Sequence, residues 1–184
     1  MKAIVYTSGT GFTQRYAQLL SELTGVPACP LKEAKKALPR DCEIFYMGWL
    51  MAGTLQGLAQ AQDRFTIRGA AIVGISPQGN GELWTEAKIN GGTSDGGARV
   101  FYLQGGYAPA KLPFFHRIMM RMMEKQVAKN ITAKAEKTAG DLDMLDLFQN
   151  GGDRVDPERL TEIADWFRNG SHDGILKSAP TVDI

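Results

Sequence analysis

Short apolar runs alternate with amphipathic stretches along most of this 184-residue chain. The first run covers residues 3–6 and stops at a turn of small and hydroxyl residues. Apolar residues then recur at helical spacing over residues 13–25, where Gly25 is a stop signal and Pro27 follows it. A strand followed by a helix, repeated at this pace, is typical of a parallel sheet with right-handed crossovers.

The alternation of strands and helices continues along the chain. We predict strands at residues 3–6, 27–31, 44–47, 69–76 and 100–103. We predict helices or helical turns at residues 13–25, 32–38, 55–65, 82–89, 114–125 and 156–170. Thr13 is the expected N-cap of the first helix, and Asp156, with Pro157 after it, of the last. The predicted fold is an α/β three-layer sandwich in one domain, residues 1–170, followed by a tail, residues 171–184.

The turn after the first strand carries the first candidate chemistry. Backbone N–H groups of such a loop, together with the positive end of the following helix, point at one spot where a phosphate can bind. Glycines allow tight turns there, and hydroxyl groups add donors. The loop has no Lys and matches neither GxxxxGK[ST] nor GxGxxG, which favours a singly phosphorylated ligand over a triphosphate with Mg²⁺. The candidate phosphate-binding residues are Thr7, Ser8, Gly9, Thr10, Gly11, Phe12 and Thr13.

This stretch resembles the phosphate-binding signature of flavodoxins, in which an apolar pair and an aromatic residue precede a hydroxyl-rich loop and a helix containing Ala. Here the signature runs over residues 4–13 and continues with Ala17 and Leu20, and every position is met. The resemblance implies a flavodoxin-like parallel sheet in the order 2-1-3-4-5. It also implies non-covalently bound FMN as the cofactor, with its phosphate on the loop.

Three further loops follow predicted strands at the same edge of the sheet, where ligands of doubly wound sheets bind. The resemblance assigns cofactor contacts to Trp49, Leu50, Met51, Ala52, Gly53 and Thr54, to Ser76, Gln78, Gly79 and Asn80, and to Gly106 and Tyr107. Trp49 and Tyr107 are expected to flank or cover the flavin ring, although an indole at a strand end can also be a core residue. The amides at 78 and 80 match the donor and acceptor edge of a flavin, and a solvated turn is the alternative.

The segment 114–125 holds four of the eight methionines within five residues. With the preceding loop, 104–113, it is similar to the flavodoxin-like protoporphyrinogen dehydrogenases of bacteria and to a flavodoxin-domain group close to them. Their loop is more aromatic and basic than Gly105-Gly106-Tyr107. Core packing is the favoured interpretation of the helical face, and an adaptable binding surface is the alternative. That face contains Phe115, Ile118, Met119, Met122 and Met123. We interpret His116 as a helix-surface residue rather than a proton donor.

Composition narrows the function classes. A net charge of +1 disfavours a nucleic-acid partner, and it differs from the strong acidity typical of electron-shuttling flavodoxins. Cys29 and Cys42 form no CxxC, so no iron–sulfur cluster or structural zinc is expected. No leader or apolar stretch of membrane-spanning length is visible. We therefore expect a cytoplasmic protein, with peripheral membrane contact left open.

Three function classes remain. The favoured one is an FMN-dependent oxidoreductase that passes electrons or hydride between a reduced donor and a quinone-like or aromatic substrate, porphyrinogens included. The second is a flavodoxin-type electron carrier with protein partners. The third is a flavodoxin-fold binding module without a redox role. The residues assign no catalytic acid, base or nucleophile.

Overall fold

The computed structural model describes residues 1–51, 53–77 and 98–169. Its centre is a parallel sheet of β1 (Ala3–Tyr6), β2 (Ala28–Pro30), β3 (Glu43–Met51), β5 (Thr66–Gly74) and β6 (Arg99–Gln104). The strands lie in the order β2-β1-β3-β5-β6. Counted along the parallel strands alone, this is 2-1-3-4-5, so the predicted fold class and strand order are confirmed.

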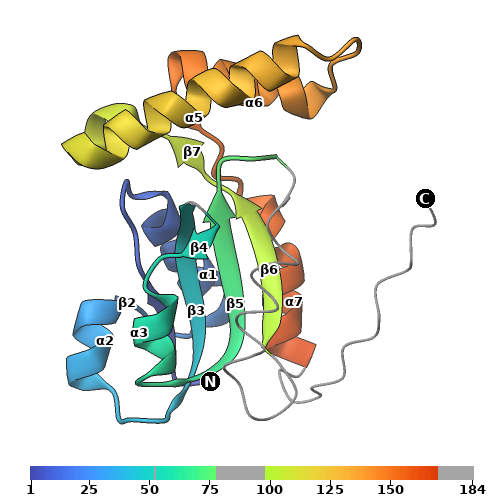
Figure 1. The fold of residues 1–184 in the computed structure, drawn as a ribbon. Coiled ribbons are helices and arrows are strands. Elements are labelled where there is room, and N and C mark those ends of the chain that lie inside the picture. The colour runs from blue at the N-terminus through green and yellow to red at the C-terminus, as the bar shows by residue number, and fades with distance from the viewer. Residues whose placement is uncertain (52, 78–97, 170–184) are drawn as a thin grey trace.

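Helices cover both faces of the sheet (Figure 1). One face packs against α1 (Phe12–Thr24) and α7 (Thr161–Asn169), and the other against α2 (Leu31–Ala37) and α3 (Leu58–Gln62). Alternate residues of each strand serve the two layers, because successive side chains of a strand point to opposite faces. In β3, Phe45 joins the core under α1 and α7, whereas Tyr46 joins the core under α2 and α3.

The region after the third parallel strand differs from its prediction. We predicted a strand at 44–47 followed by a loop and a helix at 55–65. Instead β3 continues to Met51 and pairs with the antiparallel β4 (Thr54–Leu55). The helix is shortened to α3, because Gly57 precedes it with a left-handed φ of +82° that breaks the helical path. The helix predicted at 82–89 lies outside the described residues.

An additional group of helices and short strands follows β6 and lies above the carboxyl ends of the strands (Figure 1). We call residues 106–153 the cap. It contains β7 (Gly106–Tyr107), a 3₁₀ turn (Pro109–Lys111), α5 (Phe114–Thr132), α6 (Ala139–Asn150) and β8 (Gly152–Asp153). Helix α6 was not among the predicted helices. A capping box between Thr138 and Asp141 starts that helix.

The chain returns to the sandwich through a 3₁₀ turn (Pro157–Leu160) that leads into α7. Asp156 accepts a hydrogen bond from the N–H of Glu158 at 2.9 Å, so its predicted role as the cap of this last helical segment is confirmed. Arg154 joins the return segment to α6. Its Nε donates to Asp143 at 2.7 Å and its Nη2 to Asp146 at 2.6 Å.

The predicted core packing of the Met-rich helix is wrong. Within α5, whose residues are all described, only Ile131 is buried. The reason is that α5 lies outside the two helix layers and contacts the rest of the cap along one narrow side. Phe114, Phe115 and Met122 are its most exposed apolar side chains, whereas Met120 packs against the small core of the cap.

Candidate functional site

The loop between β1 and α1 forms an uncapped helix N-terminus. Gly11, with φ at +104°, precedes the first helical residue, and no side chain among the described residues caps the helix. Thr13, the predicted N-cap, instead lies in the first turn, where it is only 2% exposed. The first turn contains no acidic residue. Its backbone N–H groups have no intrahelical partners, so they and the positive end of the helix dipole are available to an anion.

Internal hydrogen bonds hold the loop in place. The N–H of Gly11 donates to Oγ of Ser8 at 3.1 Å. The hydroxyl of Tyr46 lies 2.6 Å from the carbonyl oxygen of Gln56 and 2.8 Å from Oγ1 of Thr7. Since a carbonyl only accepts, the proton of Tyr46 goes to Gln56, and Thr7 donates its own proton to Tyr46. Thr7 therefore anchors the loop. The hydroxyls of Ser8 and Thr10 donate to none of the described residues, so their protons are available to a ligand.

Tyr46 is a support that the sequence did not reveal as such. Burial raises the pKa of its hydroxyl to about 12, so the phenol stays protonated and keeps its bond to Gln56. Gly57 sits against it closely, because a Cβ there would lie 2.3 Å from the Tyr46 hydroxyl oxygen and 2.4 Å from Oγ1 of Thr7. The only signal for this role was a tyrosine near the carboxyl end of a predicted buried strand.

Trp49 lies against the loop. A Cβ on Gly9 would be 3.2 Å from Cζ2 of the Trp49 ring. The indole also meets the ring of His116 from α5, with centroids 6.0 Å apart and the rings 75° to one another. Trp49 is half-buried between β1's loop and the cap. The structure thus brings together the predicted phosphate loop and the predicted ring-stacking residue.

His116 belongs to this contact. Its Nδ1 is shielded from solvent and has no hydrogen-bond partner within residues 1–51, 53–77 and 98–169. A neutral imidazole offers one donor and one acceptor nitrogen, so this atom can exchange a hydrogen bond with a ligand placed beside Trp49. The sequence indicated His116 only as the histidine near the predicted edge.

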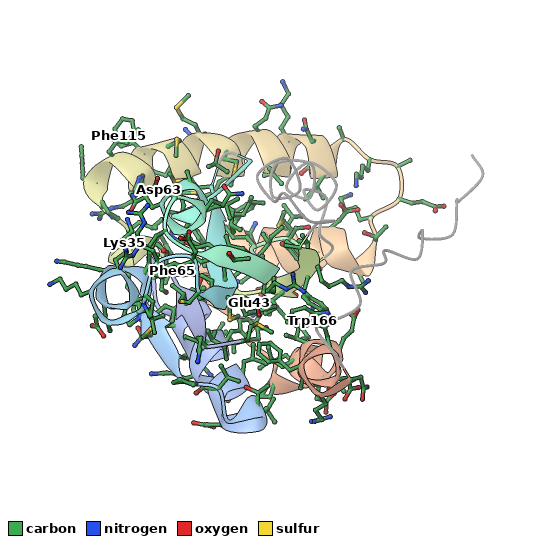
Figure 2. All side chains as sticks on the ribbon, turned by 90° about the horizontal axis from the view of Figure 1, so that it is seen from below. Lys35, Glu43, Asp63, Phe65, Phe115 and Trp166 are labelled. Carbon is green, nitrogen blue, oxygen red and sulfur yellow. The ribbon has the colours of Figure 1, made fainter. Side chains whose placement is uncertain are left out.

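A hollow of about 730 Å³ opens beside the loop. Thr7 and Ser8 form one wall, and Lys32, Lys35 and Lys36 of α2 lie on the other. Nζ of Lys35, labelled in Figure 2, donates to the side chain of Gln60 at 3.1 Å. None of the described residues that line this hollow is acidic. Its charge is therefore positive, which favours an anionic ligand.

Sequence reasoning missed these lysines because they are distant from the loop along the chain. Parallel pairing of β1 with β2 places Tyr6 opposite Pro30, and α2 begins at the next residue. The helix therefore starts at the same edge of the sheet as the loop. Three lysines directly after the second predicted strand were the available signal.

The other residues predicted to contact the cofactor after β3 and β5 lie in a hairpin and a turn or fall outside the described residues. Leu50, Met51 and Thr54 lie in the β3–β4 hairpin, with Gly53 in its turn at φ +71°. The backbone carbonyl of Ser76 accepts a hydrogen bond from Tyr102 at 2.8 Å. The remaining predictions for these loops, Ala52, Gln78, Gly79 and Asn80, fall outside the described residues.

Tyr107 and Gly106 do not form an open surface over the loop. The Tyr107 ring is 4% exposed and meets Phe148 edge to face, with centroids 5.7 Å apart. Its hydroxyl donates to the carboxylate of Glu124. Burial is the main cause that raises the pKa of Tyr107, and this hydrogen bond is the second. A Cβ on Gly106 would lie 2.4 Å from the carbonyl oxygen of Gly152. In this conformation Tyr107 supports the cap and offers no free ring face to a ligand.

No family model matches this chain, and neither does a curated protein or a solved structure among those compared. Free N–H groups, two hydroxyls and nearby lysines suit one phosphate group, and the indole suits a flat aromatic ring. The residues present at this edge fit a mononucleotide with a large planar ring.

Proposed function

We propose that this chain is a flavoprotein that binds FMN at the carboxyl edge of its sheet. The observation that carries the proposal is the uncapped N-terminus of α1, with Trp49 packed on its loop, in a sheet of order 2-1-3-4-5. In doubly wound sheets the ligand lies at the switch in strand order, and flavodoxin itself is the standard example of that rule. Here the switch falls at β1 and β3, which supply the loop and Trp49.

Each group would have a separate task. Ser8, Thr10 and the N–H groups of the first turn of α1 would bind the phosphate. Lys35 and its neighbours would add positive potential without entering the loop. Trp49 would hold the flavin ring, and Tyr46 would keep Thr7 and the loop in position. When bound, FMN supplies hydride or single-electron transfer through its isoalloxazine ring.

Within this proposal, the favoured activity is reduction or oxidation of a quinone-like or aromatic substrate. Two observations support it over a carrier that serves protein partners. The chain has a net charge of +1 rather than a strongly acidic surface. Helix α5 also lies above the site, where the ring of His116 meets that of Trp49 and would offer a ring nitrogen to a substrate beside it.

Calorimetry with FMN and with riboflavin tests the cofactor. We expect FMN to bind with a stoichiometry of one and riboflavin to bind more weakly, because it lacks the phosphate. Thr10→Ala should weaken FMN binding by about 1 kcal/mol, or about fivefold in Kd, and leave riboflavin binding unchanged. Ser21→Ala, near the other end of α1, is the matched control and should bind both ligands as the wild type does. Equal affinity for the two ligands, or no binding of either, would contradict the proposal.

Stopped-flow oxidation of the reduced, FMN-loaded protein separates the redox classes. Rapid oxidation by small quinones, with slow electron transfer to ferredoxin or cytochrome, is the expected result for the oxidoreductase. The reverse pattern would identify a carrier. A protein that binds FMN but reacts with neither acceptor would be the binding module.

A further inference from the structure

Helix α5 carries an ordered pattern that the FMN site does not use. Positions spaced by four lie in nearly continuous rows along a helix. Two neighbouring rows are apolar over the first half of α5, and a third is basic throughout. The first apolar row is Phe114, Ile118 and Met122, the second is Phe115, Met119 and Met123, and the basic row is Arg117, Arg121, Lys125 and Lys129.

The apolar rows face outward. Phe114 and Phe115 are each 73% exposed and Met122 is 70% exposed. Ile118 and Met123 are 45% and 40% exposed. Figure 2 shows Phe115 at the outer rim of the molecule, pointing away from the sheet. Large apolar side chains scattered singly on a surface are ordinary, but five of them on ten consecutive residues of one helix mark an interaction surface.

Positive charge is concentrated on the same segment. Residues 111–134 contain six basic side chains and one acid, while the whole chain has a net charge of only +1. The single acid, Glu124, accepts a hydrogen bond from the hydroxyl of Tyr107 within the cap. Arg121, Lys125 and Lys129 are exposed, and none of the three makes an ion pair with any residue that the structure describes. The cations beside the apolar rows are therefore free to meet an external anionic surface.

We propose that the outer face of α5 docks on the surface of an anionic lipid bilayer. Helices that lie in the plane of a membrane interface combine Phe-rich apolar faces with Lys and Arg side chains that reach the headgroups. No helix within the described ranges is both long and apolar enough to cross a bilayer. The half of α5 that carries the apolar rows spans about 15 Å at 1.5 Å per residue, which suits a helix lying flat at the interface.

Charge argues against a second copy of the chain as the occupant. In a symmetric dimer the same patch meets itself. Packing α5 on α5 would bring two basic rows, each with Arg121 and Lys125, to the same interface without an acidic row between them. Like charges at close range are destabilising, whereas anionic headgroups supply the missing opposite charge.

Docking in this orientation has a consequence for the site. His116, in the first turn of α5, contacts Trp49 through its ring. The end of α5 that would enter the interface is therefore the end that lies beside the candidate site. A lipid-dissolved substrate would reach that edge without crossing bulk water. The docking itself needs no cofactor, so it can fail or hold independently of the FMN proposal.

Vesicle flotation with the full chain tests the docking. We expect the protein to float with vesicles of phosphatidylcholine and phosphatidylglycerol, and to remain unbound with phosphatidylcholine alone or in high salt. Phe115→Ser combined with Met122→Ser should lower the vesicle partition coefficient at least about tenfold, because apolar area is lost from the buried face. Leu23→Ser, which removes an apolar side chain 49% exposed on α1, is the matched control and should bind vesicles normally.

Single charge changes test the basic row. Arg121→Gln and Lys125→Gln should each lower partitioning about fivefold, whereas Lys2→Gln, at the other end of the sheet, should leave it unchanged. Circular dichroism establishes that each variant is folded, which the exposure of these residues favours. Absence of flotation with anionic vesicles would overturn the proposal. So would flotation insensitive to the α5 variants, or a wild-type dimer that Phe115→Ser with Met122→Ser converts to monomer.

Discussion

The sandwich and the cap use the same kinds of side chain in opposite ways. Phe45 in β3 is fully buried, and its ring meets Phe101, Trp166 and Phe167 at centroid distances of 6.0, 5.6 and 5.2 Å. Phe115 in α5 is 73% exposed. Both lie in regular secondary structure and in apolar surroundings along the sequence. Burial is decided by whether a second layer covers the element, which a local pattern does not specify.

The cap has its own small core on the inner side of its helices. Tyr107, Leu112 and Leu147 are buried there, with Met120 packed against them. Of the two sides of α5, only this inner one is covered. The two large cores therefore lie in the sandwich, while the small core of the cap holds α5 in place with its apolar rows outward.

The largest expected contrast is between two phenylalanine truncations. Phe45→Ala should lower the free energy of unfolding by about 3–5 kcal/mol, because a large cavity forms between β3 and α7. Phe115→Ala should change it by no more than about 0.5 kcal/mol, because its ring contributes little to the folded core. Urea denaturation of both variants beside the wild type measures the difference. A loss above about 2 kcal/mol for Phe115→Ala would mean that the outer face of α5 is buried in solution.

The sequence was sufficient for the sandwich for a physical reason. In a parallel sheet covered on both faces, the central strands are continuous apolar runs, and residues 3–6 and 44–47 are recognisable as such. The stop signal at Gly25 is confirmed by its left-handed φ of +71°. Asp156 capped its helical segment as predicted, because its side chain accepts the N–H of Glu158 and Pro157 suits the first helical position.

The site and the cap were less predictable. The loop at 7–13 and Trp49 were found because their features are local, and the structure places them in contact. The lysines of α2 come from another part of the chain, and only the strand pairing brings them to the loop. A helical period in α5 could not distinguish a face toward a core from a face toward solvent, since both give the same spacing. The buried position of Tyr107 was not predicted for a related reason, because the side chains that it contacts, Phe148 of α6 and Glu124 of α5, come from later segments of the chain.

A change of intermediate size tests how firmly the cap is joined to the sandwich. Gln104, at the end of β6, is 3% exposed, and its Nε2 donates to Asp143 of α6 at 2.6 Å. Gln104→Ala should lower stability by about 1–3 kcal/mol, because it leaves a partly buried carboxylate short of one donor. In hydrogen exchange, the Gln104→Ala variant should show a larger increase over the wild-type exchange rate in α6 than in β3. The control is Gln126→Ala, an exposed glutamine of α5, which should leave both rates unchanged. Equal acceleration in β3 and α6 would mean that sandwich and cap open as one unit.

The smallest expected effect is a change in stability when the pH is lowered, caused by Asp141 at the start of α6. A hydrogen bond from Lys134, followed by one from the Thr138 backbone, lowers the pKa of Asp141 from 3.8 to about 2. A carboxyl whose pKa is lower in the folded state stabilises the fold above its unfolded pKa, and this stabilisation is lost as pH falls through the folded value. Asp141→Asn should therefore be less stable than the wild type at pH 6, and the gap should close between about pH 4 and pH 2. Urea midpoints at the two ends of that window measure it, with Glu22→Gln, an exposed acid of α1, as the control. A gap that persisted at pH 2 would mean that the Asp141 charge does not hold the start of α6, and that the cap depends on its small core alone.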